Sequence, residues 1–170
     1  MKRQNRFFRW IGLFAVTALV GLWCFGGILT AEIGDSSNAE WPQWRGPNRD
    51  GISRETGFLK NWPAGGPTVI WRAPLGEGFS SISISQGRAY TMYAQGGDEF
   101  VVCLDAATGQ QMWRFRSDEI FNDNQGGNGP RSTPTVDGDS VFALSAYGKL
   151  YALNAKNGEK LWAHDLKREF

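Results

Sequence analysis

Polar side chains that could contact a ligand gather in one stretch of the sequence, NDNQGGNGPR at residues 122–131. The oxygens of Asn122, Asp123 and Asn124 suit a calcium ion or a hydrogen-bonding substrate, and the guanidinium of Arg131 suits an anion. Asp123 is also a candidate general base. The spacing does not match an EF-hand, whose loop ends on an acidic residue. Because glycine and asparagine are equally typical of loops that only turn, the four residues are candidates for ligand contact and nothing stronger.

The other reactive side chains form no catalytic set. His164 is the only histidine, and it shares the strand phase of Trp162, which favours a packing or rim position. Cys103 lies within a predicted strand, where a free cysteine usually behaves as a small buried hydrophobe. The sequence contains no Gly-x-Ser-x-Gly elbow, phosphate-binding loop or Cys-x-x-Cys motif. It therefore assigns no catalytic residue and no metal ligand.

The elements that must position these candidates are β-strands, because short apolar stretches separated by turn residues follow one another from residue 68 onward. The chain has 22 glycines and eight tryptophans, a combination typical of many turns and repeated aromatic anchors. The predicted strands span residues 68–72, 81–84, 88–92, 100–104, 111–115, 134–136, 140–144, 149–153 and 160–163.

One segment of the chain occurs twice. VCLDAATGQQMW at residues 102–113 aligns without gaps on YALNAKNGEKLW at residues 151–162, with four of the twelve positions identical and a spacing of 49 residues. The repeats as a whole span about residues 80–116 and 132–165. A repeat of roughly 50 residues with four short strands has the size of one propeller blade.

The first half of the repeated segment is a turn. Asp105 and Asn154 can accept hydrogen bonds from backbone N–H groups two or three residues further on, which folds the chain back. Gly109 and Gly158 can adopt a left-handed conformation that costs other residues about 1 kcal/mol or more. Both copies are therefore predicted to turn in the same way.

The second half carries a structural tryptophan. Trp113 and Trp162 occupy the same place in the two copies, and Trp71 ends an earlier stretch that matches only this part of the motif. An aromatic side chain at a fixed place in each repeat can wedge between neighbouring sheets, burying on the order of 200 Å² each time. These tryptophans are expected to dock one sheet on the next.

The resulting prediction is an all-β fold, a β-propeller of four-stranded antiparallel blades, with about two blades and one leading strand present. WD40 blades are excluded because the Gly-His and Trp-Asp pairs are missing. Kelch repeats fit poorly because a glycine pair occurs only once in the repeats, at Gly96 and Gly97. About four blades are the minimum for a closed ring, so the chain is expected to be the N-terminal part of a longer protein.

Residues 1–39 are predicted to be a signal peptide or a membrane anchor. Four basic residues precede an uncharged apolar stretch at residues 11–31, expected to be helical, and acidic residues follow it. This charge asymmetry predicts that everything after residue 31 is exported across the inner membrane. The exported part is then either periplasmic or anchored to the membrane. About 20 apolar residues are long for a signal peptide and just long enough to span a bilayer, so both readings stay open.

Residues 40–67 form an irregular lead-in, and residues 68–170 form the partial propeller. Proline and glycine are too dense in the lead-in for a long helix or a central strand. Its three tryptophans suggest a segment laid on a surface and not a free linker.

Charge and cysteine content exclude nucleic-acid-binding proteins and disulfide-stabilised scaffolds. Of 18 basic residues four precede the apolar stretch, and of 17 acidic residues two precede residue 40, which leaves 14 basic and 15 acidic residues beyond it. No basic surface is expected, so nucleic acid is excluded as a partner. A disulfide scaffold is excluded because the exported part holds one cysteine.

The segment LDAATGQQMW at residues 104–113 resembles the tryptophan-docking motif of propeller repeats of the pyrroloquinoline quinone (PQQ) type. WPQWRGPNRDG at residues 41–51 and GPRSTPT at residues 129–135 are similar to exported PQQ-like propellers of environmental bacteria. The resemblance covers about residues 40–170.

The resemblance implies two possible functions. Some PQQ-like propellers are dehydrogenases that hold PQQ and Ca²⁺ at the channel mouth and oxidise alcohols or sugars, and others are cofactor-free scaffolds that bind proteins. The motifs here match neither the base nor the calcium ligands of the dehydrogenases. The leading hypothesis is an exported binding or scaffold module with a protein or small molecule in its channel, and the alternative is the N-terminal part of a PQQ-dependent dehydrogenase. Fold alone does not decide between them.

Overall fold

The computed structural model describes residues 40–57 and 60–170. Its regular elements are eight strands and one short helix. In chain order they are β1 (Ser83–Ser85), β2 (Arg88–Gln95), β3 (Asp98–Asp105), β4 (Gln111–Glu119), β5 (Thr135–Asp137), β6 (Ser140–Leu144), β7 (Lys149–Asn154), β8 (Lys160–Asp165) and α1 (Leu166–Glu169).

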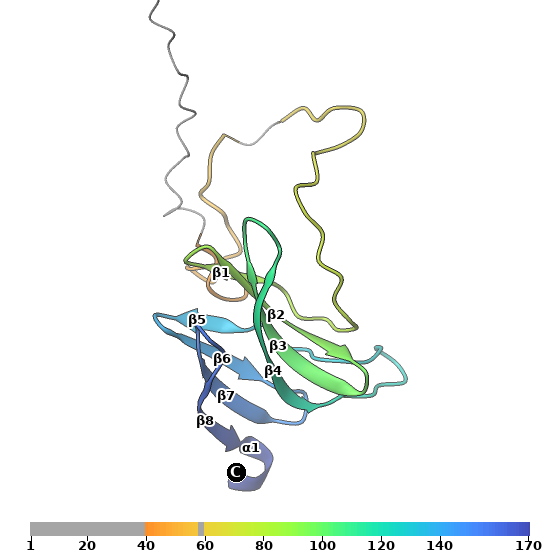
Figure 1. Cartoon of the computed structure of the whole chain (residues 1–170), viewed down its shortest axis with the longest axis vertical. Coiled ribbons are helices and arrows are strands. Elements are labelled where there is room, and N and C mark those ends of the chain that lie inside the picture. The colour runs from red at the N-terminus through yellow and green to blue at the C-terminus, as the bar shows by residue number, and fades with distance from the viewer. Residues whose placement is uncertain (1–39, 58–59) are drawn as a thin grey trace, which may run out of the picture. The chain divides into compact units, whose positions relative to one another are not determined.

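The strands form two sheets of identical topology (Figure 1). One has the order β1-β2-β3-β4 and the other β5-β6-β7-β8, and every neighbouring pair is antiparallel. Each sheet is thus a four-stranded meander, which is the arrangement of a propeller blade. The prediction of an all-β fold built from two such repeats is confirmed.

The turn between the last two strands forms in the same way in both sheets. The Asp105 carboxylate accepts hydrogen bonds from the backbone N–H groups of Ala107 and Thr108, at 3.1 and 2.8 Å. The Asn154 side-chain oxygen accepts one from Lys156 at 2.9 Å. The glycine that follows each turn is left-handed, with φ of 72° at Gly109 and 74° at Gly158.

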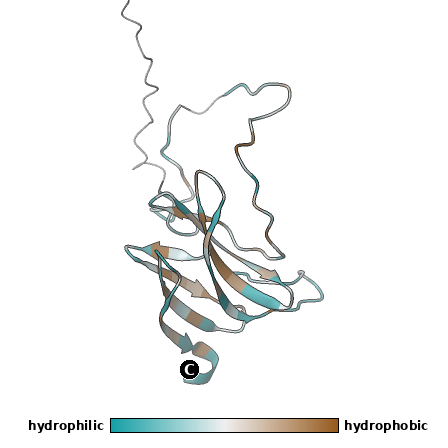
Figure 2. Cartoon of the chain, in the orientation of Figure 1, coloured by the Kyte–Doolittle hydropathy of each residue, from teal (hydrophilic) through white to brown (hydrophobic). Residues whose placement is uncertain are grey.

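An apolar core joins the two sheets. The strands carry most of the hydrophobic positions (Figure 2), and those on the facing sides of the sheets are buried. The main cluster contains buried residues of both sheets, namely Tyr90, Met92, Val101, Cys103, Trp113, Val136, Val141, Ala143, Tyr151, Leu153 and Ala155. The two blades therefore pack directly on each other.

Trp71 and Trp113 make the same contact one repeat apart. The Trp71 indole N–H donates to the carbonyl of Ala106 at 3.0 Å, and the Trp113 indole N–H donates to the carbonyl of Ala155 at 3.0 Å. Each ring lies directly against the left-handed glycine of the turn that it meets, Gly109 or Gly158. A tryptophan before or within one blade thus docks on the glycine turn of the following blade.

Trp162 is the third tryptophan of the series. Its ring contacts Phe142 on the same sheet at 5.8 Å between centroids, and the residue is 41% exposed. Within residues 40–57 and 60–170, no glycine turn lies against it. Trp162 therefore lacks the docking contact that Trp71 and Trp113 make in the described part of the chain.

One predicted strand does not form. Residues 68–72 pair with no other strand in the described structure, although Trp71 reaches its docking site. A short extended stretch is stable as a strand only when a neighbour satisfies its backbone groups, and here no such neighbour is present among the described residues. The prediction of a strand at residues 68–72 is thus wrong, while the prediction that Trp71 docks on a neighbouring sheet is confirmed.

The predicted apolar helix and the choice between signal peptide and anchor fall within residues 1–39, outside the described residues. In the part of the chain that the structure describes, no helix is long and apolar enough to span a bilayer.

Candidate ligand-binding site

The start of the lead-in lies against the first strands of both sheets. Trp41 and Ile84 of β1 exchange two backbone hydrogen bonds, at 2.8 and 2.9 Å. The carbonyl of Pro42 then accepts from Val136 of β5 at 2.7 Å. This segment therefore bridges the first strands of the two sheets at the junction between them.

The chain then folds back on itself in a tight loop. Arg45 and Arg49 have φ of 66° and 58°, and the N–H of Gly51 donates to the Arg45 carbonyl at 2.9 Å. A Cβ on Gly46 would lie 2.7 Å from the Trp41 ring, so only glycine lets the loop close over the indole. The lead-in is therefore a folded part of the blade junction over residues 40–51.

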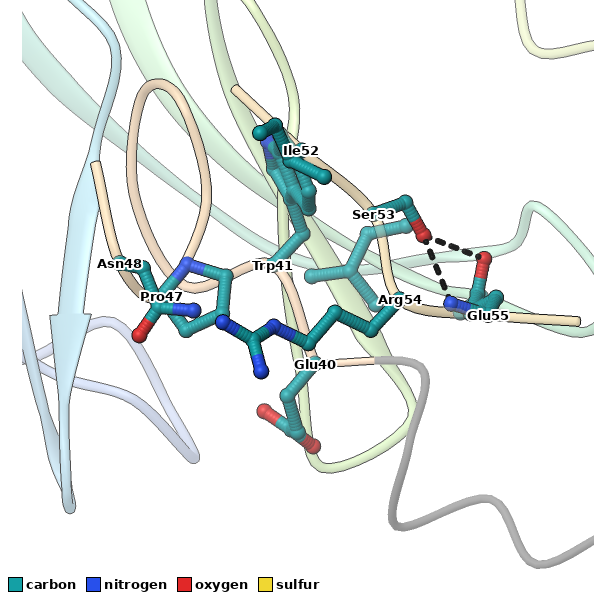
Figure 3. A pocket seen from close by; sticks show the side chains of 10 residues that line it. Glu40, Trp41, Pro47, Asn48, Ile52, Ser53, Arg54 and Glu55 are labelled. Atoms are coloured by element: carbon teal, nitrogen blue, oxygen red, sulfur yellow. Dashed lines mark hydrogen bonds between the residues drawn. The ribbon is translucent and has the colours of Figure 1, made fainter. Parts of the chain in front are cut away.

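Two hollows border the lead-in. The larger, of about 760 Å³, is built mostly by residues 40–55. Figure 3 shows Trp41 and Ile52 in its wall and the charged groups of Glu40, Arg54 and Glu55 around it. Its lining is mainly apolar and its charges are mixed in sign, which points to no particular ligand.

The smaller hollow, of about 390 Å³, contains the arginine that sequence reasoning selected. We call it the Arg131 hollow; it is lined by Trp44, Phe79, Ser81, Arg131, Ser132 and Thr133. Ser81 lies two residues before the start of β1, and Thr133 lies two residues before the start of β5. The hollow therefore opens where the chain enters the first strand of each blade.

Arg131 is held rigidly in the wall of this hollow. Its Nη2 donates to a carboxylate oxygen of Asp123 at 3.1 Å and to the carbonyl of Gly127 at 2.6 Å. The guanidinium also lies over two rings, 4.6 Å from the centroid of Phe79 and 5.3 Å from that of Phe121. Ion pairing and stacking together fix the plane of the guanidinium.

Asp123 supplies the countercharge. Backbone hydrogen bonds from Gln125 and Gly126 and the nearby Arg131 guanidinium hold the pKa of the Asp123 carboxyl below its usual range. A carboxyl that is ionised and bound in this way is a poor proton acceptor. The structure thus favours a positioning role for Asp123 over the role of a general base.

The glycines of the loop are needed for close approach to its surroundings. The N–H of Phe79 donates to the carbonyl of Pro130 at 2.9 Å, which draws the 76–80 segment against the loop. A Cβ on Gly127 would lie 3.1 Å from the Phe79 ring, and one on Gly129 would lie 2.8 Å from the Glu77 carbonyl oxygen. The glycines therefore serve the packing of Phe79 and are not only turn formers.

The four predicted candidates separate into two pairs. Arg131 lines the hollow and Asp123 pairs with Arg131, whereas Asn122, outside the lining, donates its side-chain amide to the carbonyl of Ile120 at 3.2 Å. Asn124 does not line the hollow. The ligand roles of all four stay predictions.

Calcium does not fit this set of donors. The only carboxylate among the four candidates is paired with a guanidinium at 3.1 Å, and a cation bound there would face the positive charge of Arg131. In addition, residues 40–57 and 60–170 contain no cluster of three His, Cys, Asp or Glu side chains arranged to hold a metal ion.

Sequence reasoning missed the aromatic wall of the hollow. Trp44 lies within the WPQW motif and Thr133 within GPRSTPT, both noted as family-like stretches, yet nothing in the sequence links them. In the structure both residues border the same hollow, where the Thr133 hydroxyl oxygen also accepts a hydrogen bond from the Ser81 N–H at 3.0 Å. Phe79 carried no signal of its own.

A buried carboxyl anchors the start of the loop. Glu99 of β3 accepts a hydrogen bond from the Phe121 N–H at 3.1 Å, and its other oxygen, Oε2, is buried with no hydrogen-bond partner among the described residues. Burial raises the pKa of the Glu99 carboxyl, and the neighbouring Asp118 carboxylate adds to the rise. Burial alone would also raise the pKa of Asp118. Hydrogen bonds from Lys149 and Ser145 outweigh this effect and hold the pKa of Asp118 below its usual range.

Replacing Glu99 by glutamine should remove a pH dependence of stability. Because the folded state raises the pKa of Glu99 above its usual 4.5, wild-type stability falls as the pH rises from that value through the folded pKa. E99Q should therefore gain stability relative to the wild type with rising pH. Urea unfolding at about pH 4 and about pH 8 measures the difference. Glu119→Gln, on an exposed position of β4, is the matched control, and parallel pH curves for E99Q and the wild type would contradict the prediction.

One family model matches more than half of the chain. The model of the family described as outer membrane protein assembly factor BamB matches residues 63–169. The outer membrane protein SlpA of Deinococcus radiodurans is 32% identical over 84 residues, which are 49% of this chain and 7% of SlpA.

Three solved structures resemble part of the chain. BamB from Moraxella catarrhalis has 18% identity and a TM-score of 0.40, over 53% of this chain and 25% of that one. A europium-containing methanol dehydrogenase has 20% identity and a TM-score of 0.39, over 50% and 15%. A quinohaemoprotein alcohol dehydrogenase from Pseudomonas putida HK5 has 22% identity and a TM-score of 0.41, over 56% and 14%. The chain thus spans a quarter or less of the length of these relatives.

Proposed function

The chain belongs to the PQQ-like propeller-repeat family described as outer membrane protein assembly factor BamB, and from this premise we propose that it is part of an exported β-propeller that acts as a binding or scaffold module in the cell envelope. In this proposal residues 1–39 export or anchor the protein, residues 40–67 lead in, and residues 68–170 contribute blades. The family description and the outer-membrane relative support an envelope location.

The observation that carries the proposal is the Arg131 hollow. It is a recess beside the points where the chain enters β1 and β5, lined by two aromatic rings, three hydroxyl side chains and one fixed guanidinium. A few polar groups set precisely among apolar ones are typical of a small-molecule site. The ion pair between Arg131 and Asp123 positions the wall of the hollow, so its chemistry is recognition and not proton transfer.

The residues of the hollow do not support the binding of a quinone cofactor there. PQQ carries three carboxylates, and in the dehydrogenases it is bound with Ca²⁺. Arg131 is the only cation that lines the hollow, and its charge is already balanced by Asp123 at 3.1 Å. The candidate loop therefore matches neither the charge of the quinone nor the coordination of the calcium ion.

A cofactor-loading experiment tests the proposal. The full-length protein is incubated with PQQ and Ca²⁺, passed over a size-exclusion column and assayed for dye reduction with a panel of alcohols and sugars. The expected result is protein without quinone absorbance and without turnover. An apo quinoprotein dehydrogenase loaded in parallel is the positive control. Stoichiometric quinone together with turnover would establish the dehydrogenase alternative instead.

A further inference from the structure

The Arg131 hollow exposes two aromatic rings to solvent. Trp44 is 64% exposed and Phe79 is 57% exposed, and both belong to the lining of this one recess. Isolated exposed apolar side chains are common on protein surfaces, but two rings that border the same recess are typical of a binding site. The volume of about 390 Å³ lies within the range of small-molecule sites, about 300–1,000 Å³.

The polar groups of the hollow retain hydrogen-bonding capacity. The Thr133 hydroxyl oxygen accepts from the Ser81 N–H at 3.0 Å, which leaves its O–H free to donate. Arg131 uses Nη2 for both of its hydrogen bonds, to Asp123 and Gly127. Its Nε and Nη1 have no acceptor among the described residues, so they are available to an oxygen-bearing ligand.

Charge argues against an ionic ligand. The countercharge of Asp123 offsets Arg131, so an anion gains little net attraction. A cation would be repelled by two guanidinium groups, since Arg131 lies 4.6 Å from the Phe79 centroid and Arg45 lies 5.9 Å from the Trp44 centroid. The remaining ligands are uncharged.

A purely apolar ligand does not fit either. It would cover the donors of Thr133 and Arg131 without replacing their hydrogen bonds to water, and burying a polar group without a partner weakens binding. The hollow requires a ligand with one apolar face for the rings and several oxygens around its edge. A pyranose ring has this distribution, with C–H groups on its faces and hydroxyls at its rim.

We propose that the Arg131 hollow is a carbohydrate subsite, in which a neutral sugar ring of a glycan packs against the exposed parts of the Trp44 and Phe79 rings and hydrogen-bonds to Thr133 and Arg131. This inference rests on the proposed function as a binding module, and it specifies the class of ligand. Ser81 and Ser132 add hydroxyl oxygens to the same wall. The rigid guanidinium selects the orientation of the ring because its plane is fixed by Phe79 and Phe121.

Titration calorimetry of the full-length protein tests the inference. The ligands are neutral tetrasaccharides of β-glucose, α-glucose, mannose and N-acetylglucosamine, with oligogalacturonate as the anionic comparison. At least one neutral tetrasaccharide should bind, and W44A and F79A should each weaken its affinity by about tenfold or more, because each removes an aromatic surface that the sugar ring covers. W44F should retain most of the affinity because it keeps a ring in place.

Trp62→Ala is the matched control, because Trp62 is 60% exposed and lies outside the hollow. The affinity of W62A for the tetrasaccharide should equal that of the wild type. No binding of any neutral tetrasaccharide, binding that W44A and F79A leave unchanged, or a preference for oligogalacturonate would each overturn the inference. The proposed function is judged separately by quinone loading, so absence of both sugar and quinone binding would reject the sugar subsite and leave the binding module standing.

Discussion

Replacing Trp113 by alanine should lower the free energy of unfolding by about 3–5 kcal/mol, the usual cost of removing a buried tryptophan side chain. Trp113 is 8% exposed and belongs to the core that joins the two blades. Its ring lies 5.9 Å from that of Tyr90, and its indole N–H donates to the Ala155 carbonyl at 3.0 Å. The substitution therefore removes packing on both blades and leaves a cavity at their junction.

Chemical unfolding of full-length W113A, followed by circular dichroism, measures this loss. Trp44→Ala is the matched control, because it removes the same side chain from a position that is 64% exposed. Its expected change is within about 0.5 kcal/mol, as for most surface substitutions. Equal effects of W113A and W44A would show that Trp113 does not hold the blades together.

Replacing Gly158 by alanine should lower the free energy of unfolding by about 2–5 kcal/mol through two effects. The residue has φ of 74°, and a left-handed alanine costs about 1–2 kcal/mol. Its new Cβ would also lie 2.6 Å from the Trp113 ring, and overpacking of this kind adds about 1–3 kcal/mol. The indole cannot simply move away, because the hydrogen bond to Ala155 and the contact with Tyr90 hold it.

Gly138→Ala separates the two effects. Gly138 lies in the β5–β6 turn with φ of 55°, and nothing lies within 4 Å of the Cβ that alanine would add. G138A should therefore show the conformational cost alone, about 1–2 kcal/mol. Thermal or urea unfolding of G158A and G138A measures the difference, and an equal loss in both would mean that the contact with Trp113 is not tight.

The blades could be predicted from the sequence because their determinants are local. Strand alternation, the turn residues Asp105 and Asn154 and the glycines that follow them act within a dozen residues of one another. The repeat then identifies the tryptophans as the residues that dock one sheet on the next. Sequence alone does not show that Trp71 docks without a strand around it, because strand formation depends on a partner elsewhere.

Only part of the candidate site could be predicted from the sequence, because some of its residues are brought together by contacts between distant segments. Arg131 and Asp123 are neighbours in one loop, so their pairing could be anticipated. Trp44 and Phe79 reach the hollow through backbone contacts made elsewhere: Trp41 pairs with Ile84, and Phe79 donates to the Pro130 carbonyl. Contacts between segments so far apart leave no periodic pattern in a single sequence.

The central claim is that consecutive repeats are joined by a tryptophan of one blade pressed against the glycine turn of the next, and a double-mutant cycle between Trp113 and Gly158 tests it most directly. The free energy of unfolding is measured by urea for the full-length wild type, W113A, G158A and the double variant. Once the indole is gone, alanine at position 158 should cost only its backbone strain. The sum of the two single losses should therefore exceed the loss in the double variant by about 1–3 kcal/mol. Losses that add to within about 0.5 kcal/mol would contradict the claim, because independent sites behave in that way.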